Sequence, residues 1–105
     1  MRKEILQTVK SLAKIIAVGL DAKRIYLFGS YATGENTEDS DLDFYVIVDL
    51  QGKKKIELTQ QARKLLLKRS KSPIDILIGD RKDFEEKKDN ITTLEYTIAH
   101  EGIIL

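Results

Sequence analysis

The sequence predicts an α/β fold, of the α+β kind, in which a single small mixed β-sheet is flanked by helices. Apolar residues recur at helical spacing in several stretches of the 105-residue chain, and short runs of β-branched and aromatic residues lie between them. The expected order is helix, strand, strand, helix, strand, helix, strand, which favours one sheet covered by helices. We expect one domain, because two separate cores in a chain of this length would each be too small to be stable.

The first half of the chain contains one helix and two strands by these criteria. Residues 3–19 predict an amphipathic helix, since apolar side chains recur on one face at Ile5, Val9, Leu12 and Ile16. The run RIYLF at residues 24–28 predicts a short strand, and the turn-forming residues 31–40 predict a short helix or a loop. The run DLDFYVIV at residues 41–48 is the strongest strand signal, because β-branched and aromatic residues continue to its end.

The second half repeats this alternation. Residues 53–70 return to helical spacing, and Pro73 is expected to end this helix, whose inward-facing side chains are Leu58, Ala62, Leu65 and Leu66. Residues 74–78 (IDILI) predict another strand. Residues 80–101 predict a short charged helix and then a second helix with one apolar face, made of Ile91, Leu94 and Ile98. Residues 103–105 are expected to be extended.

A net charge of +1 hides a strong segregation of charge along the chain. Residues 35–49 hold six acidic side chains and no basic one, which indicates a site. Residues 53–71 hold eight basic side chains and one acidic one, including a helical stripe of Lys64, Lys68 and Lys71. Such a stripe suits RNA, nucleotide phosphates or an acidic partner, although most charged helix faces are simply solvated, so nucleic acid is not the favoured ligand.

Several classes of protein are disfavoured by composition. The chain has no cysteine, which excludes disulfides and thiolate chemistry, and its single histidine argues against a His-rich zinc site. No apolar run approaches the roughly 20 residues of a membrane-spanning helix. The first residues predict an amphipathic helix and not a signal peptide, so we expect a cytoplasmic protein.

Asp41 and Asp43 open the strongest predicted strand. Alternate residues of a strand point to the same face, with Cα atoms roughly 6.5 Å apart, so both carboxylates can approach one pair of divalent cations. Oxygen ligands without histidine or cysteine suit Mg²⁺ or Mn²⁺. Two acids placed this closely repel each other unless a cation is present. Taken alone, however, an Asp-x-Asp pair is more often a polar strand start than a metal site.

Gly29 and Ser30 follow the first predicted strand. A glycine at this point lets the backbone approach a ligand closely, and free N–H groups at a helix start suit a phosphate. The alternative is an ordinary turn in which Ser30 caps a short helix.

Asp75 opens the otherwise apolar third strand. Burial of this carboxylate would be unfavourable without a partner, and the same cations would supply one. The alternative is an acid at an exposed strand end.

Taken together, the segments FGSYATGE at residues 28–35 and DSDLD at residues 39–43 resemble the minimal nucleotidyltransferases of the polymerase-β-like superfamily. The resemblance covers nearly the whole chain, including the leading helix, the Pro-Ile-Asp strand and the closing residues 101–105. It implies a polymerase-β-like nucleotidyltransferase core and one nucleotidyltransferase domain over residues 1–105.

The resemblance also implies roles for the site residues. Gly29 and Ser30 would hold the triphosphate of a nucleotide, and Asp41 and Asp43 would bind two Mg²⁺ ions, with Mn²⁺ as a substitute. Asp75 would help to hold one metal and activate the attacking hydroxyl. The implied reaction moves a nucleoside monophosphate from an NTP to a hydroxyl and releases pyrophosphate. Thr33 stands where many relatives carry arginine, which leaves that arginine's phosphate contact in doubt.

Finally, the resemblance implies a partner. Chains of this kind commonly accompany a HEPN-domain toxin and act as its antitoxin, by transferring AMP from ATP to a tyrosine of the toxin or by binding it. The alternatives are a non-catalytic antitoxin that masks its partner by contact and an RNA-modifying nucleotidyltransferase. A homo- or hetero-oligomer would supply the base and acceptor recognition that a small core lacks. Tyr31 and Tyr45 could stack on a nucleobase, or Tyr45, which points to the same strand face as Asp43, could only wall the site.

Overall fold

A computed structural model describes all residues of the chain, 1–105, and contains one four-stranded sheet. The strands lie in the order β3-β2-β1-β4, where β1 is antiparallel to β2 and β4, and β2 is parallel to β3. The predicted mixed sheet is therefore confirmed. The elements in chain order are α1 (Lys3–Leu20), β1 (Arg24–Phe28), α2 (Ser30–Thr33), β2 (Leu42–Val48), α3 (Lys55–Leu65), β3 (Ile74–Asp80), α4 (Arg81–Lys87), α5 (Leu94–Glu101) and β4 (Ile103–Ile104).

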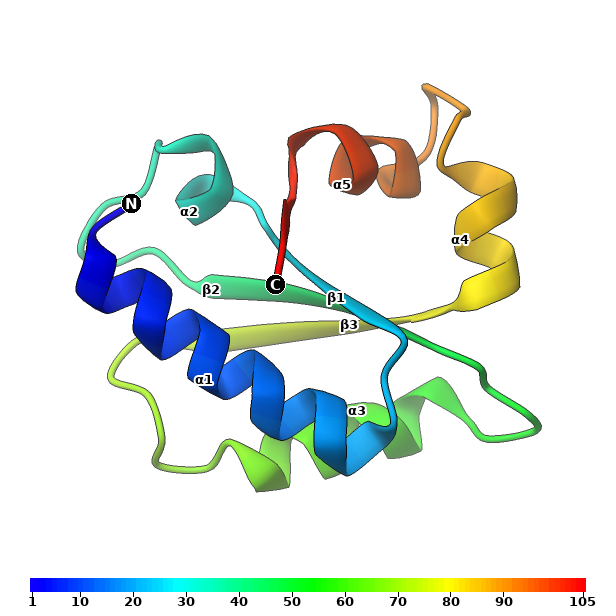
Figure 1. The fold of residues 1–105 in the computed structure, drawn as a ribbon, viewed down its shortest axis with the longest axis horizontal. Coiled ribbons are helices and arrows are strands. Elements are labelled where there is room, and N and C mark those ends of the chain that lie inside the picture. The colour runs from blue at the N-terminus through cyan, green and yellow to red at the C-terminus, as the bar shows by residue number, and fades with distance from the viewer.

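Helices cover both faces of the sheet (Figure 1). Helices α1 and α3 lie together on one face, whereas α4 and α5 lie on the other. Because alternate residues of a strand point to opposite faces, Phe44 and Val46 of β2 pack with the core of α1 and α3. Tyr45 and Ile47 point the other way and pack on the side of α4 and α5. This two-sided burial explains the nearly continuous apolar run of β2.

Helix α1 matches its prediction closely. Its buried side chains include Val9, Leu12 and Ile16, and it ends at Leu20. Asp21 then adopts a left-handed conformation with φ 52°, and its N–H donates to the Ala17 carbonyl. Neither α1 nor any other helix has the length and apolar character that would be needed to cross a membrane.

Helix α3 is shorter than predicted, because it ends at Leu65 and not near residue 70. The chain turns over residues 66–69, where Lys68 adopts a left-handed conformation with φ 61°. Pro73 therefore does not end the helix. Its role is to begin β3, since its carbonyl accepts the Leu42 N–H at 2.9 Å. The chain has to turn early because β3 must return to lie beside β2.

The prediction that Ile91, Leu94 and Ile98 form one apolar helix face is wrong. Ile91 precedes α5 and is 74% exposed, Leu94 is also exposed, and only Ile98 is buried. The helix begins at Leu94 because the Thr93 side chain caps it, accepting the Tyr96 N–H at 3.1 Å. Residues before this cap belong to the preceding turn.

Phe84 of α4 should carry much of the stability of the second core. It is 1% exposed and lies between the rings of Tyr26 and Tyr45, with ring centroids 5.7 Å apart in each pair. We predict that Phe84→Ala lowers the free energy of unfolding by about 3–5 kcal/mol, because it leaves a cavity. Ile91→Ala, at an exposed position, should change it by less than about 0.5 kcal/mol. Urea unfolding of both variants checks this, and equal losses would contradict the assignment.

Candidate active site

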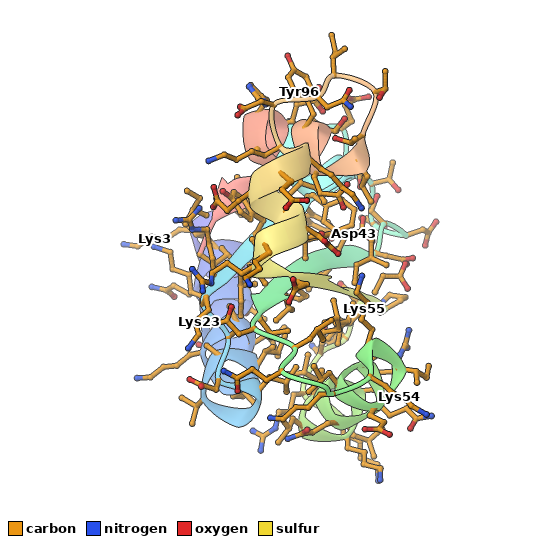
Figure 2. The ribbon with its side chains drawn as sticks, turned by 90° about the vertical axis from the view of Figure 1, so that its right-hand side faces the viewer. Lys3, Lys23, Asp43, Lys54, Lys55 and Tyr96 are labelled. Carbon is orange, nitrogen blue, oxygen red and sulfur yellow. The ribbon has the colours of Figure 1, made fainter.

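Three aspartates from different parts of the chain meet at one end of the sheet. Asp41 directly precedes β2, Asp43 lies in β2, and Asp75 is the register partner of Asp43 in β3. One carboxylate oxygen from each of the three residues lies within 4.8 Å of the other two. Figure 2 shows that the Asp43 side chain leaves the sheet on the side of α4 and α5. We call these residues the aspartate trio.

Asp75 is not buried, so the expected unfavourable burial of its carboxylate does not occur. Asp75 is exposed, because β3 is an edge strand and α4 begins only at Arg81. Its nearness to the other two acids, and not its burial, therefore marks it as a site residue.

The trio is electrostatically unfavourable by itself. The pKa of the Asp43 carboxyl is raised from 3.8 to about 6, and the largest cause is its partial burial. The negative charges of Asp75 and then Asp41, and a hydrogen bond with Asp75, contribute the rest of this rise. A bound cation would remove this repulsion. Three oxygen donors with no nitrogen or sulfur among them form a set that could bind a hard divalent metal.

Gly29 lies against the trio. Its backbone has φ 75° and ψ −155°, which only glycine adopts readily. A Cβ atom at this position would collide with Oδ2 of Asp43, because Asp43 pairs with the neighbouring residue Phe28 across β1 and β2. Glycine is therefore needed here for both conformation and space, and the group that its backbone approaches closely is the Asp43 carboxylate.

Ser30 begins the short helix α2 directly after Gly29. The Ala32 and Thr33 N–H groups donate to the Gly29 carbonyl at 3.1 and 3.2 Å. The first N–H groups of a helix have no acceptor within it, so those of Ser30 and Tyr31 remain available for other partners. The start of α2 thus lies directly after Gly29, the residue that contacts the aspartate trio.

The two tyrosines near the motif do not offer their rings to a nucleobase. Tyr31 is buried in the core with α1, and Tyr45 is buried on the other face of the sheet. The Tyr45 hydroxyl donates to Oε2 of Glu95 at 3.1 Å, and its burial raises the pKa of the phenol. The burial of both rings argues against stacking on a nucleobase, and the interpretation of Tyr45 as a wall of the site stays a prediction.

Two residues near the site were missed. Glu95 receives the Tyr45 hydrogen bond from 50 positions away, and no local pattern signals that contact. Leu77 is 41% exposed and lies on the same strand face as Asp75. The period of two in residues 74–78 would have placed Leu77 beside Asp75, where it presents apolar surface next to the trio.

The raised pKa of Asp43 predicts a stability change in metal-free protein. The folded state keeps the Asp43 proton up to about pH 6, while the unfolded chain loses it near pH 3.8, so stability falls as pH rises between these values. Asp43→Asn should therefore stabilise the fold at pH 7.5. The full shift corresponds to about 3 kcal/mol, and we expect about 1–2 kcal/mol because solvent screens a partly buried group.

Urea unfolding in EDTA at pH 7.5 and pH 4 measures this difference. The advantage of Asp43→Asn should shrink at pH 4, because Asp43 is then protonated in the folded state and the pH lies close to the unfolded-state pKa of 3.8, so little of the destabilisation remains. Asp39→Asn, in the exposed loop before the trio, serves as the matched control and should change little at either pH. A variant that is no more stable than the wild type at pH 7.5 would contradict the assigned repulsion.

Comparison with known proteins agrees with this geometry. A curated relative from Methanocaldococcus jannaschii, named "Putative protein adenylyltransferase", is 46% identical over 46 residues, which cover 44% of this chain and 46% of that relative. A crystal structure of a toxin-antitoxin with AMP-PNP superposes with a TM-score of 0.57 and 23% identity, over 91% of this chain and 70% of the other. A crystal structure of a nucleotidyltransferase from Sulfolobus solfataricus, described as putative, superposes with a TM-score of 0.58 and 16% identity. The superposition covers 96% of this chain and 78% of the other.

Because the two solved structures are only 23% and 16% identical to this chain, the likeness to them shows a shared fold and nothing more. The chain spans less than half the length of the curated relative that it matches. The family model for the nucleotidyltransferase domain matches residues 2–100, which is nearly the whole chain and includes every residue of the site. Since sequence, fold and site all agree with that match, this chain belongs to the nucleotidyltransferase domain family.

Proposed function

We propose that this protein is a nucleotidyltransferase that moves a nucleoside monophosphate, AMP from ATP, to a hydroxyl group of a partner protein. The observation that carries the proposal is the convergence of the aspartate trio, with oxygens within 4.8 Å of one another, directly beside Gly29. A bound cation would relieve the repulsion between the three carboxylates, and Gly29, which has no side chain, would leave room for a phosphate ligand beside them.

Each of the site residues would have its own role in the reaction. Asp41, Asp43 and Asp75 would hold two Mg²⁺ ions, which supply positive charge to the phosphate oxygens when bound. The Ser30 hydroxyl and the N–H groups after Gly29 would hold the triphosphate. Asp75, which lies in β3 and is exposed, would accept the proton of the attacking hydroxyl. A bond forms between that hydroxyl oxygen and the α-phosphorus, the bond from the α-phosphorus to the bridging oxygen breaks, and pyrophosphate leaves.

The choice of AMP and of a protein acceptor is supported by the relative named a protein adenylyltransferase. A toxin partner is supported by the fold shared with a toxin-antitoxin structure that contains AMP-PNP. On the resemblance described above, we propose a HEPN-domain protein as that toxin and this chain as its antitoxin.

Transfer should depend on Asp43. We predict that Asp43→Asn lowers transfer of radiolabel from α-labelled ATP at least about 100-fold in the presence of Mg²⁺, because it removes the carboxylate at the centre of the trio. EDTA should abolish the wild-type reaction. The same assay with GTP, CTP and UTP identifies the preferred nucleotide.

Asp39→Asn, which removes an equal charge outside the trio, should retain wild-type rates. Unfolding curves establish that both variants remain folded. If folded Asp43→Asn retained the wild-type transfer rate, the site assignment would be wrong.

The antitoxin role requires a separate experiment with the toxin partner. If neutralisation depends on transfer, a double variant with Asp41→Asn and Asp43→Asn should fail to restore growth of cells that express the toxin. Co-purification should show that this variant still binds the toxin. Full neutralisation by the double variant would instead mean that the protein masks its partner by contact, and would overturn the catalytic part of the proposal.

A further inference from the structure

Two grooves run around the loop that joins α3 to β3. The first, of about 670 Å³, is lined by residues from the start of α1, from the loop, and by Tyr31 and Leu42, which are sequence neighbours of Ser30 and of the trio. The second, of about 340 Å³, follows the end of α3 to Ile74 and Ile76, on either side of Asp75 in the chain. Ser70 and Ser72 line both grooves, so the two grooves adjoin at this loop. In Figure 1 this loop lies below the N-terminal turn of α1.

Basic side chains line this path. Arg2, Arg69 and Lys71 lie in the first groove, and Arg63 and Lys68 in the second. None of these five forms an ion pair, since the three ion pairs of the protein involve Lys23, Arg81 and Lys88. Glu4 is the only acid in either lining.

The early end of α3 produces this arrangement. Residues 68–71 leave the helix, so their cations do not form the solvated helix stripe expected from sequence. The Arg69 side chain is held at the loop, where its Nε donates to the Leu65 carbonyl at 2.9 Å. Five unpaired cations in a protein of net charge +1 are a local concentration and not a general property of the surface.

We propose that these two grooves bind the backbone of a single-stranded nucleic acid. Two adjoining grooves that are both lined by cations suit a ligand whose negative charges repeat regularly, as phosphodiesters do. The Ser72 hydroxyl, which lines both grooves, can donate to a phosphate oxygen, whereas the Thr8 and Ser70 hydroxyls already donate to the Glu4 and Ser72 carbonyls. Exposed Leu67 in the second groove adds apolar surface for a base.

This surface is distinct from the candidate active site. Leu42, Ile74 and Ile76 pack with the α1 and α3 core, whereas Asp43 and Asp75 point to the opposite face of the sheet. Binding in the grooves therefore requires neither metal nor nucleotide, so it can be tested with EDTA present and independently of transfer.

The test is fluorescence anisotropy with a 12-nucleotide single-stranded RNA in 50 mM NaCl and EDTA. The wild type should bind, and the logarithm of its affinity should fall with the logarithm of salt concentration with a slope of about −2 to −3.5, as three to five phosphate contacts to a single strand require. Arg69→Glu with Lys71→Glu should weaken binding at least about tenfold. Arg2→Glu, which lies before α1 and cannot disturb the loop, should weaken it about threefold.

The matched control is Lys10→Glu with Lys14→Glu, which makes the same charge change on exposed positions of α1 outside both grooves. Its affinity should stay within about 1.5-fold of the wild type, a smaller loss than that of either groove variant. Absence of wild-type binding, or equal losses in the groove and control variants, would overturn the proposal. So would displacement of the RNA by a polyglutamate peptide at equal concentration, because an acidic protein segment would then be the better ligand.

Discussion

The parallel pairing of β2 with β3 is the constraint on which the rest of the structure depends. Its register sets Asp43 opposite Asp75, and the bond from the Leu42 N–H to the Pro73 carbonyl fixes that register at the end where the site lies. A slip of one residue would send Asp75 to the opposite face and into the core of α1 and α3. Parallel strands also need a crossover, and α3 provides it while covering one face of the sheet.

The same pairing creates the electrostatic problem that defines the site. The apolar faces of β2 bury Asp43 in part, and the register adds the charge of Asp75 beside it. Gly29 removes the side chain that would otherwise fill the space over the carboxylate. The chain thus maintains a partly buried acid, repelled by its neighbours, directly beside a residue that has no side chain. Packing alone does not favour that combination, whereas binding of a cation and a phosphate does.

The local parts of this arrangement could be predicted from the sequence, but the parts set by tertiary contacts could not. The runs 24–28 and 41–48 identify their strands because both the residue types and the turn signals are local. Asp41, Asp43 and Asp75 were grouped through spacing and resemblance, and the fold brings them together. The end of α3 was misplaced because helical spacing continues past Leu65, and the early turn serves the return to β2. The burial of Tyr31 depends on α1, and no signal near residue 31 reports it.

The segment from the end of α3 to Asp75 links the two charged regions of the molecule. Within about ten residues the chain presents cations in the grooves and then an acid on the other face of the sheet. These charges do not neutralise each other in ion pairs, although their sum over the whole protein is close to zero. Because alternate residues of β3 point to opposite faces, Ile74 faces the grooves whereas Asp75 faces the other side of the sheet. Each region is therefore left with uncompensated charge, so a cation at the trio and a polyanion in the grooves would both bind more favourably than the modest net charge of the protein suggests.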